Sequence, residues 1–367
     1  MPGNLMPRLF LLGHSSKFSC PIVNDLFSPV SIVDSGSKNN EVGMNRMEQG
    51  YAVWQSSHPV VVVTLLLVLF CPLVASSPVE RNGFVISEPL IPINEIYGGG
   101  PPRDGIPSLD DPAFISASDA GFLSPDDKLL GMSVNGVKKA FPIGILDYHE
   151  LVNDAFNGQP VTLSYCPLCG TGMAFNPMVD GKHLQFGVSG LLYNNDLLMY
   201  DRNTDSLWSQ MEGRAISGPL KGAYLDRLPV EHTTWRIWRE RHPDTLVLSG
   251  ETGFYRNYGV SPYPAYDKSR RVLFPLSNYD KRYHPKEMVI GIELADKAKA
   301  YPFTELARGK SPLADTINGQ ALSVEYSAQD RSARILDDKG EVLTSVTAYW
   351  FAWMAFHPDS DVYTFEE

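Results

Sequence analysis

Basic side chains are scarce in this chain of 367 residues. It has 31 Lys and Arg against 42 Asp and Glu, which gives a formal net charge of -11. A protein that binds the phosphate backbone of nucleic acid needs a dense cationic face, which this composition does not supply. We therefore expect no nucleic-acid partner. The 43% hydrophobic and 20% charged content is ordinary for a globular protein and excludes wholesale disorder and a polytopic membrane protein.

A long uninterrupted apolar run is also missing. The most apolar stretch, residues 60–71, is shorter than the roughly 20 residues that a membrane-spanning helix needs. Because Arg46 precedes it and small or aliphatic residues follow it, the pattern predicts a signal peptide over residues 44–76 that is removed before Ser77. The alternative is an uncleaved anchor over residues 59–75. Either way we expect an exported protein, periplasmic or extracellular, that meets a membrane only through this N-terminal segment.

Cysteine is the third scarce residue. Of the four cysteines, Cys20 and Cys71 lie in the part that we expect to be lost, which leaves Cys166 and Cys169 as the only pair in the mature chain. Outside the cytoplasm, two cysteines separated by two residues can form a disulfide, a redox couple or half of a metal site. The compartment alone does not choose among these three.

What the sequence does have is an internal repeat. Three stretches recur later in the chain with their glycines, prolines or tryptophans at matching positions. The pairs are 131–142 with 291–302 at an offset of 160, 154–165 with 315–326 at 161, and 235–244 with 350–359 at 115. We therefore expect two degenerate repeat halves related by a pseudo-two-fold axis. The predicted segments are a dispensable extension (1–43), the signal peptide or anchor (44–76), an irregular lead-in (77–121), the first half with the Cys pair and inserted strands (122–281), and the second half without the pair (282–367).

Local patterns predict short strands and short helices in both halves. An Asn-Gly turn between residues 129–134 and 137–141 is typical of a hairpin. Apolar spacing predicts a helix over residues 145–156, and Thr234 is expected to begin a helix whose two tryptophans pack in the core. Alternation over residues 161–165 predicts a strand that leads into the Cys pair. The expected fold class is α+β, rich in antiparallel strands.

The two halves differ at the cysteines. Cys166 and Cys169 align with Ser327 and Asp330, so the thiols belong to one half only and are candidates for function. The segment after the pair does not predict a helix, so the arrangement is closer to a metal-binding turn than to a thioredoxin-type site. Gly170 allows a positive φ there. Metal binding, thiol redox chemistry and an inert disulfide all remain open.

Further ligands must come from elsewhere, because the mature chain has no second Cys pair. His149 is the first choice for a metal ligand beside Cys166 and Cys169, and His183 is the second. Two thiolates with an imidazole would suit copper or zinc. The residues expected near the cysteines are His149, Tyr165, Thr171, Asp201 and Arg202.

Several long motifs, in this order, resemble one family. They are SYCPLCGTGMAF (164–175), FGVSGLLYNNDLLMYDRNTDSLWSQ (186–210), TWRIWRERHPDT (234–245) and the segment 286–302. Over roughly residues 110–365 the chain is similar to an exported prokaryotic family known as domain of unknown function 3179. The resemblance implies no established reaction.

The sequence therefore predicts an extracytoplasmic protein in which Cys166 and Cys169 form a thiol-disulfide or metal-thiolate centre. In the alternative, the protein is a non-enzymatic binding or structural module in which the cysteines form an inert disulfide. The residues do not decide whether the chain is an enzyme, and they name no redox or metal-delivery partner.

Overall fold

The computed structural model describes residues 78–366, and this part of the chain is mostly β structure. Strands make up 42% of it and helices 10%. The predicted signal peptide or anchor and the extension before it lie outside the described residues. Within the described part, no helix combines the length and the apolar character that a membrane span requires.

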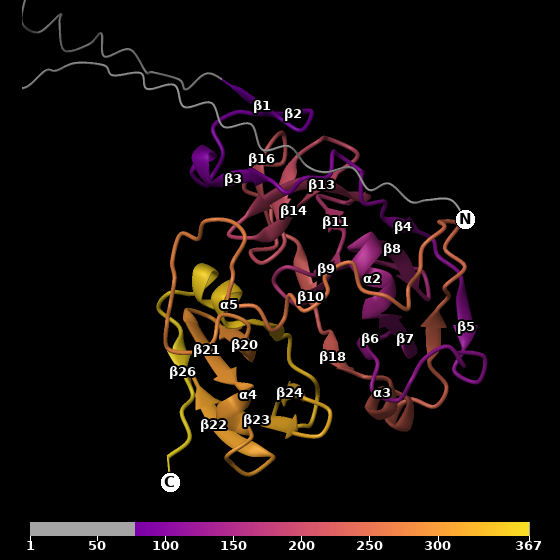
Figure 1. Ribbon diagram of the computed structural model, residues 1–367, viewed down its shortest axis with the longest axis vertical. Coiled ribbons are helices and arrows are strands. Elements are labelled where there is room, and N and C mark those ends of the chain that lie inside the picture. The colour runs from indigo at the N-terminus through magenta and orange to yellow at the C-terminus, as the bar shows by residue number, and fades with distance from the viewer. Residues whose placement is uncertain (1–77, 367) are drawn as a thin grey trace, which may run out of the picture. The chain divides into compact units, whose positions relative to one another are not determined.

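In residues 78–366, five sheets of three or more strands are arranged as the blades of a five-bladed β-propeller (Figure 1). The predicted α+β class with two repeat halves is therefore wrong. The helices have at most seven residues, too short to form a layer of their own. Four of the strands inserted in the first half form a sheet with β3 that has no counterpart in the second half, so the chain does not divide into two equivalent halves.

Two sheets lie nearest the cysteines. In hydrogen-bonded order, the cysteine sheet contains β17 (Asp226–Leu228), β10 (Thr171–Asn176), β9 (Gln159–Cys166), β8 (Leu151–Phe156) and β4 (Leu109–Asp110). The inserted sheet contains β16 (Arg214–Ser217), β15 (Leu207–Ser209), β14 (Asp196–Asp201), β13 (Phe186–Tyr193) and β3 (Ile96–Gly98). The prediction of antiparallel strands in the insertion is confirmed.

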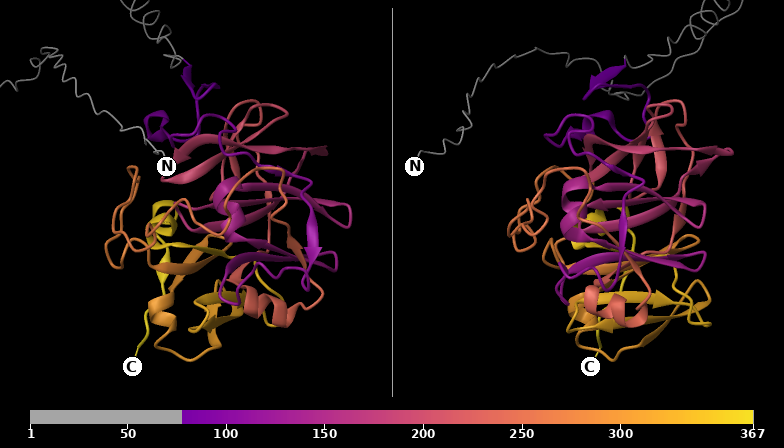
Figure 2. Two further views of the ribbon diagram at one scale, coloured as in Figure 1. Left: turned by 45° about the vertical axis from the view of Figure 1, so that its right-hand side comes forward. Right: turned by 90° about the vertical axis from the view of Figure 1, so that its right-hand side faces the viewer.

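Two further sheets each carry a pair of tryptophans on the helix that follows one strand. The first tryptophan sheet contains β18 (Glu231–Thr234), β6 (Lys128–Val134), β7 (Val137–Pro142), β19 (Leu246–Leu248) and β5 (Phe114–Ser116). The second contains β25 (Val346–Tyr349), β20 (Met288–Leu294), β21 (Lys297–Pro302) and β26 (Asp361–Val362). In the turned views the inserted sheet lies toward one end and the C-terminal strands toward the other (Figure 2).

The fifth sheet, which we call the Ser-Asp sheet after its turn, contains β22 (Leu313–Ile317), β23 (Gln320–Ser327) and β24 (Ser332–Leu336). Two short hairpins complete the strands: β1 (Val79–Arg81) with β2 (Phe84–Ile86), and β11 (Met178–Val179) with β12 (Lys182–His183). The helices are η1 (Ile93–Glu95), α2 (Ile143–His149), α3 (Trp235–Arg241), α4 (Phe303–Leu306) and α5 (Trp350–Phe356). Between residues 78 and 121, β3, β4 and β5 add edge strands to three different sheets.

The aligned segments of the repeat share their strand pairing. The hairpins β6–β7 and β20–β21 have the same lengths, and each is flanked by an antiparallel strand that leads into a helix and by a parallel strand that follows it. Gly131 and Gly291 show why the repeat keeps glycine. A Cβ atom at either would lie 2.3 Å from the ring of Trp238 or Trp353. Glycine therefore lets each tryptophan pack directly on the hairpin, as the predicted core role requires.

Two of the local predictions are confirmed and one is wrong in part. The Asn-Gly hairpin is confirmed, and α3 begins after Thr234, whose side chain accepts a hydrogen bond from the amide of Ile237. The helix predicted over residues 145–156 is wrong beyond His149. Glu150 has a left-handed backbone (φ 57°), which ends α2. The following apolar residues then form β8, because they pair with β9 instead of continuing the helix.

Candidate functional site

The cysteines lie at the turn that joins β9 and β10. Cys166 is the last residue of β9 and pairs with Thr171, the first of β10. The Cys169 amide donates to the Cys166 carbonyl over 3.2 Å, which closes the turn. Gly170 has φ 62°, so the predicted left-handed glycine is confirmed. The turn is held from outside as well, because the Tyr349 amide donates to the Cys169 carbonyl over 2.8 Å.

Both cysteines are free thiols and are buried, with 2% of Cys166 and none of Cys169 exposed. They belong to the largest cluster of buried apolar residues, together with Trp208 of the inserted sheet and Trp353 of α5. The cysteine turn is thus enclosed by parts of three sheets that are far apart in the sequence.

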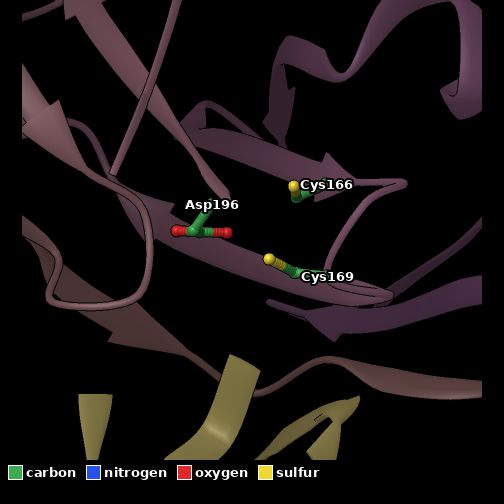
Figure 3. Close-up of side chains that lie close together, drawn as sticks. All are labelled: Cys166, Cys169 and Asp196. Atoms are coloured by element: carbon green, nitrogen blue, oxygen red, sulfur yellow. The ribbon is translucent and has the colours of Figure 1, made fainter. Parts of the chain in front are cut away.

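A third potential ligand lies beside the thiols. One carboxylate oxygen of Asp196 and the two sulfur atoms all lie within 4.8 Å of one another, and Figure 3 shows the three side chains directed toward a common point. Asp196 is the first residue of β14. It follows a tight turn in which Asn194 and Asn195 both have positive φ, of 53° and 64°. Asparagine tolerates this conformation better than most residues, so the local sequence supports the turn.

Hydrogen bonds orient the Asp196 carboxylate. Its Oδ2 accepts from the Met211 amide over 3.1 Å, and its Oδ1 lies 3.4 Å from the Thr171 hydroxyl, which donates to it. Cys166 Sγ donates to the Asn195 carbonyl over 3.6 Å. Such contacts hold a carboxylate and a thiol in place before any metal binds.

Burial dominates the electrostatics of this cluster. It raises the pKa of Cys166, raises that of Cys169 well above its usual value, and raises that of Asp196 to about 7. Burial also raises the pKa of nearby Glu150 to about 8, and the charges of Asp196 and Asp147 add to this effect. Among the described residues, no Lys or Arg donates a hydrogen bond to the thiols or to Asp196. The buried cation Lys286 acts on Cys169 only at a distance, since burial lowers the Lys286 pKa and the charge of Cys169 opposes this without a hydrogen bond between the two described side chains.

His149, the predicted histidine ligand, is not part of the three-residue cluster. Its ring is buried, with Nδ1 2.8 Å from the Pro107 carbonyl and Nε2 2.7 Å from the Tyr258 hydroxyl. Both ring nitrogens thus have partners, and burial lowers its pKa. His183, the second choice, is exposed on β12.

The other predicted neighbours divide into two groups. Tyr165 and Thr171 flank the cysteines, and the Thr171 hydroxyl also lies 2.9 Å from Gln210 Oε1. Asp201 and Arg202 instead hold a turn of the inserted sheet. Asp201 accepts from the amide of Thr204 and from the indole of Trp208, and Arg202 forms an ion pair with Asp110 at 2.7 Å.

Asp196 is the residue that sequence reasoning missed. It lies in the insertion, with no spacing motif that connects it to the Cys pair. Its one local signal is the Asn194-Asn195 pair, which marks a turn without saying what the next side chain faces. Only the packing of the inserted sheet against the cysteine sheet brings it to the thiols.

Comparisons with known proteins confirm the family that the sequence motifs resemble. No curated protein and no solved structure matches the chain. A family model described as "Protein of unknown function (DUF3179)" matches residues 103–360, which include the first tryptophan sheet, the cysteine turn and Asp196. The match covers well over half of the sequence, and the chain therefore belongs to the DUF3179 family of proteins of unknown function.

Proposed function

We propose that Cys166, Cys169 and Asp196 bind one divalent metal ion, and that zinc is the ion. The observation that carries this proposal is the meeting of two thiols and a carboxylate oxygen within 4.8 Å in a buried place. Ligand atoms about 2.0 to 2.3 Å from a zinc ion lie within such distances of one another. The three side chains come from two sheets, so the ion would join them.

The donor set favours zinc over copper. Copper(I) prefers soft thiolate and thioether ligands, whereas zinc accepts thiolate, imidazole and carboxylate alike. With Asp196 in place of the predicted imidazole, the set is two sulfurs and one oxygen. Three protein ligands also leave a fourth zinc position for water or a substrate, as in catalytic zinc sites.

The charge balance supports a cation here. Two thiolates and a carboxylate carry three negative charges in a buried cluster, and no described Lys or Arg donates to them. A bound dication would offset most of this charge, and the thiols would lose their protons as it binds. The contacts of Asp196 with Met211 and Thr171 would then hold the carboxylate oxygen toward the ion.

A thiol-disulfide couple is the competing function. The two sulfurs are close neighbours in one turn, which is what a reversible disulfide requires. Attack on a disulfide needs a thiolate, however, and burial raises the pKa of both thiols. Without a cation, the pair would thus be a poor nucleophile at neutral pH.

Elemental analysis combined with thiol titration of the purified full-length chain tests the proposal. We expect about one zinc per chain, lost in Cys166→Ser and in Asp196→Asn. Asp330→Asn is the matched control, because Asp330 aligns with Cys169 but lies in the Ser-Asp sheet. It should keep the metal.

Two other outcomes would contradict the metal centre. A metal-free protein whose cysteines oxidise and reduce reversibly would establish the redox couple. An unreactive disulfide without metal would instead establish the binding or structural module.

We also infer that the mature protein is exported and begins near Ser77. The apolar run before it and the small residues at its end support cleavage at this point. Mass spectrometry of the exported protein should find an N-terminus near Ser77. Recovery of residues 59–75 in the mature chain would indicate an anchor in place of a signal peptide.

A further inference from the structure

A cavity of about 320 Å³ opens next to the cysteine turn, where four of the five sheets meet. Tyr165 and Gly170, which flank the two cysteines in the sequence, form part of its wall. Four cationic side chains also line it, namely those of Lys128, Lys268, Lys286 and Arg331, against one carboxylate, Asp267. This is a local excess of positive charge in a protein whose formal net charge is -11.

Lys286 is the most informative of these cations. Only 4% of it is exposed, and its Nζ donates to the Arg271 carbonyl over 2.8 Å and lies 4.0 Å from the centre of the Tyr266 ring. Within residues 78–366 it forms no ion pair with a carboxylate. Burial lowers its pKa to about 8, so the ammonium group is destabilised where it lies. Backbone carbonyls, aromatic rings and the charge of Cys169 stabilise this ammonium in part, and a bound anion would stabilise it further.

Two more cations reach the cavity without carboxylate partners. Lys128 Nζ donates to the carbonyls of Asp330 and Arg331, and burial lowers its pKa to about 8. The Arg331 guanidinium has no ion pair or hydrogen bond with any other described residue, and it is exposed at the turn between β23 and β24. Both side chains are therefore available to a ligand.

A partly buried histidine forms part of the cavity wall. His232 Nδ1 is covered and makes no hydrogen bond in the described part of the chain. Burial lowers the pKa of His232 to about 3, so its ring is neutral at ordinary pH. His232 therefore presents an uncharged ring in this wall.

Aligned positions of the matching segments line the cavity together. His232 and Thr347 align at the offset of 115, Gly170 and Arg331 at 161, and Lys128 and Met288 at 160. In each pair the two copies carry different chemistry. A cation thus stands in only one member of each of the pairs Gly170 with Arg331 and Lys128 with Met288, whereas the strands that form the wall pair in the same way in both copies.

We infer that this cavity binds a small organic anion, with a phosphate or carboxylate group held by Lys286, Lys128 and Arg331. Ile143, Met288 and Tyr349 supply an apolar wall for the rest of the molecule. The inference goes beyond the proposed metal centre, because no lining residue is a proposed metal ligand.

Isothermal titration calorimetry on the purified full-length chain tests this inference. The probes are phenyl phosphate and benzoate, with neutral benzyl alcohol for comparison. We expect at least one of the anions to bind and benzyl alcohol not to bind measurably. Lys286→Gln and Arg331→Gln should each raise the Kd by about tenfold, because each removes a charged hydrogen bond to the anion. Lys182→Gln, on the exposed hairpin β11–β12, is the matched control and should leave the Kd unchanged.

Further measurements separate this site from the metal centre. Zinc content should be unchanged in Arg331→Gln, and anion binding should persist after zinc is removed with a chelator. Anion binding that disappears with the metal would place the anion on the ion and overturn the inference. So would equal affinity for benzyl alcohol, or equal losses in the Lys182 and Arg331 variants. If Lys286→Gln fails to fold, the exposed Arg331 and Lys268 variants decide the matter.

Discussion

The cysteine turn and its counterpart in the Ser-Asp sheet share their strand pairing but carry different side chains. At the offset of 161, Cys166 paired with Thr171 becomes Ser327 paired with Ser332. The residue before the returning strand is left-handed in both, with φ 62° at Gly170 and 43° at Arg331. The scaffold therefore specifies the turn without specifying which side chains it presents.

The two turns differ in the hydrogen bonds that stabilise the charged forms of their buried side chains. Burial acts to raise the pKa of Asp330, but hydrogen bonds from Ser327, Thr234 and Arg236 outweigh it and lower the pKa. These side chains of the protein therefore stabilise the charged form of Asp330. The thiols and Asp196, in contrast, have raised pKa values, and no described Lys or Arg donates a hydrogen bond to them. The hydrogen bonds of the protein itself thus stabilise the Asp330 turn, whereas in the proposed metal centre the bound ion would supply positive charge beside the thiols.

Exchanging the two turns should produce the largest effect. The double variant Cys166→Ser/Cys169→Asp copies the Ser-Asp turn into the cysteine sheet. We expect its zinc content to fall from about one per chain to none, because both thiolates are lost. Elemental analysis measures this change. The reciprocal variant Ser327→Cys/Asp330→Cys should gain no zinc, since the described residues place no further metal-binding cluster there. Zinc bound stoichiometrically by that variant would break the comparison.

The shared scaffold predicts equal damage in the two tryptophan sheets. In Gly131→Ala and in Gly291→Ala the new methyl group would lie 2.3 Å from a tryptophan ring. Each should lower the free energy of unfolding by about 3 kcal/mol through overpacking. Urea denaturation checks this, with Gly121→Ala as the control because no atom lies within 4 Å of a Cβ there. A clear difference between the two variants would show that the copies are not equivalent in packing.

Asp330 should stabilise the protein in a pH-dependent way. Its pKa in the folded state lies below the ordinary value of 3.8, so its contribution is present above about pH 4 and is lost as the pH falls through the folded pKa. Asp330→Asn should therefore cost about 2 kcal/mol at pH 7 and much less at pH 3. Thermal unfolding across this range measures the difference. A cost that does not change with pH would mean that the carboxylate charge is unimportant.

Asp147 on α2 should show the opposite slope and a smaller effect. Burial raises its pKa to about 6, against a weaker opposing hydrogen bond from Ser261. A raised carboxyl pKa destabilises the folded state as the pH rises from about 4 through 6. Asp147→Asn should thus stabilise the protein by about 1 to 2 kcal/mol at pH 8, with little gain at pH 3. Calorimetry at the two pH values would test this, and a loss of stability at pH 8 would contradict it.

Sequence reasoning succeeded where the signal is local. The Asn-Gly hairpin, the Thr234 helix start and the strand into the Cys pair depend on residues a few positions apart, and the structure has all three. It failed at residues 150–156, because apolar spacing there fits a strand as well as a helix and the left-handed Glu150 separates the two. The pairing of β8 with β9 decided the outcome.

The sequence by itself identified the family, the matching glycine and tryptophan segments, and the two thiols that distinguish the cysteine turn from its counterpart, but it wrongly extended these matches to two repeat halves. Matching glycines and tryptophans are visible without coordinates, because close packing of a ring on a hairpin permits only glycine. Only the tertiary structure decided that Asp196, and not His149, lies with the thiols, and that Lys128, Lys286 and Arg331 share a cavity. Sheets place residues from distant segments side by side, and the packing of one sheet on another leaves no periodic trace in either segment.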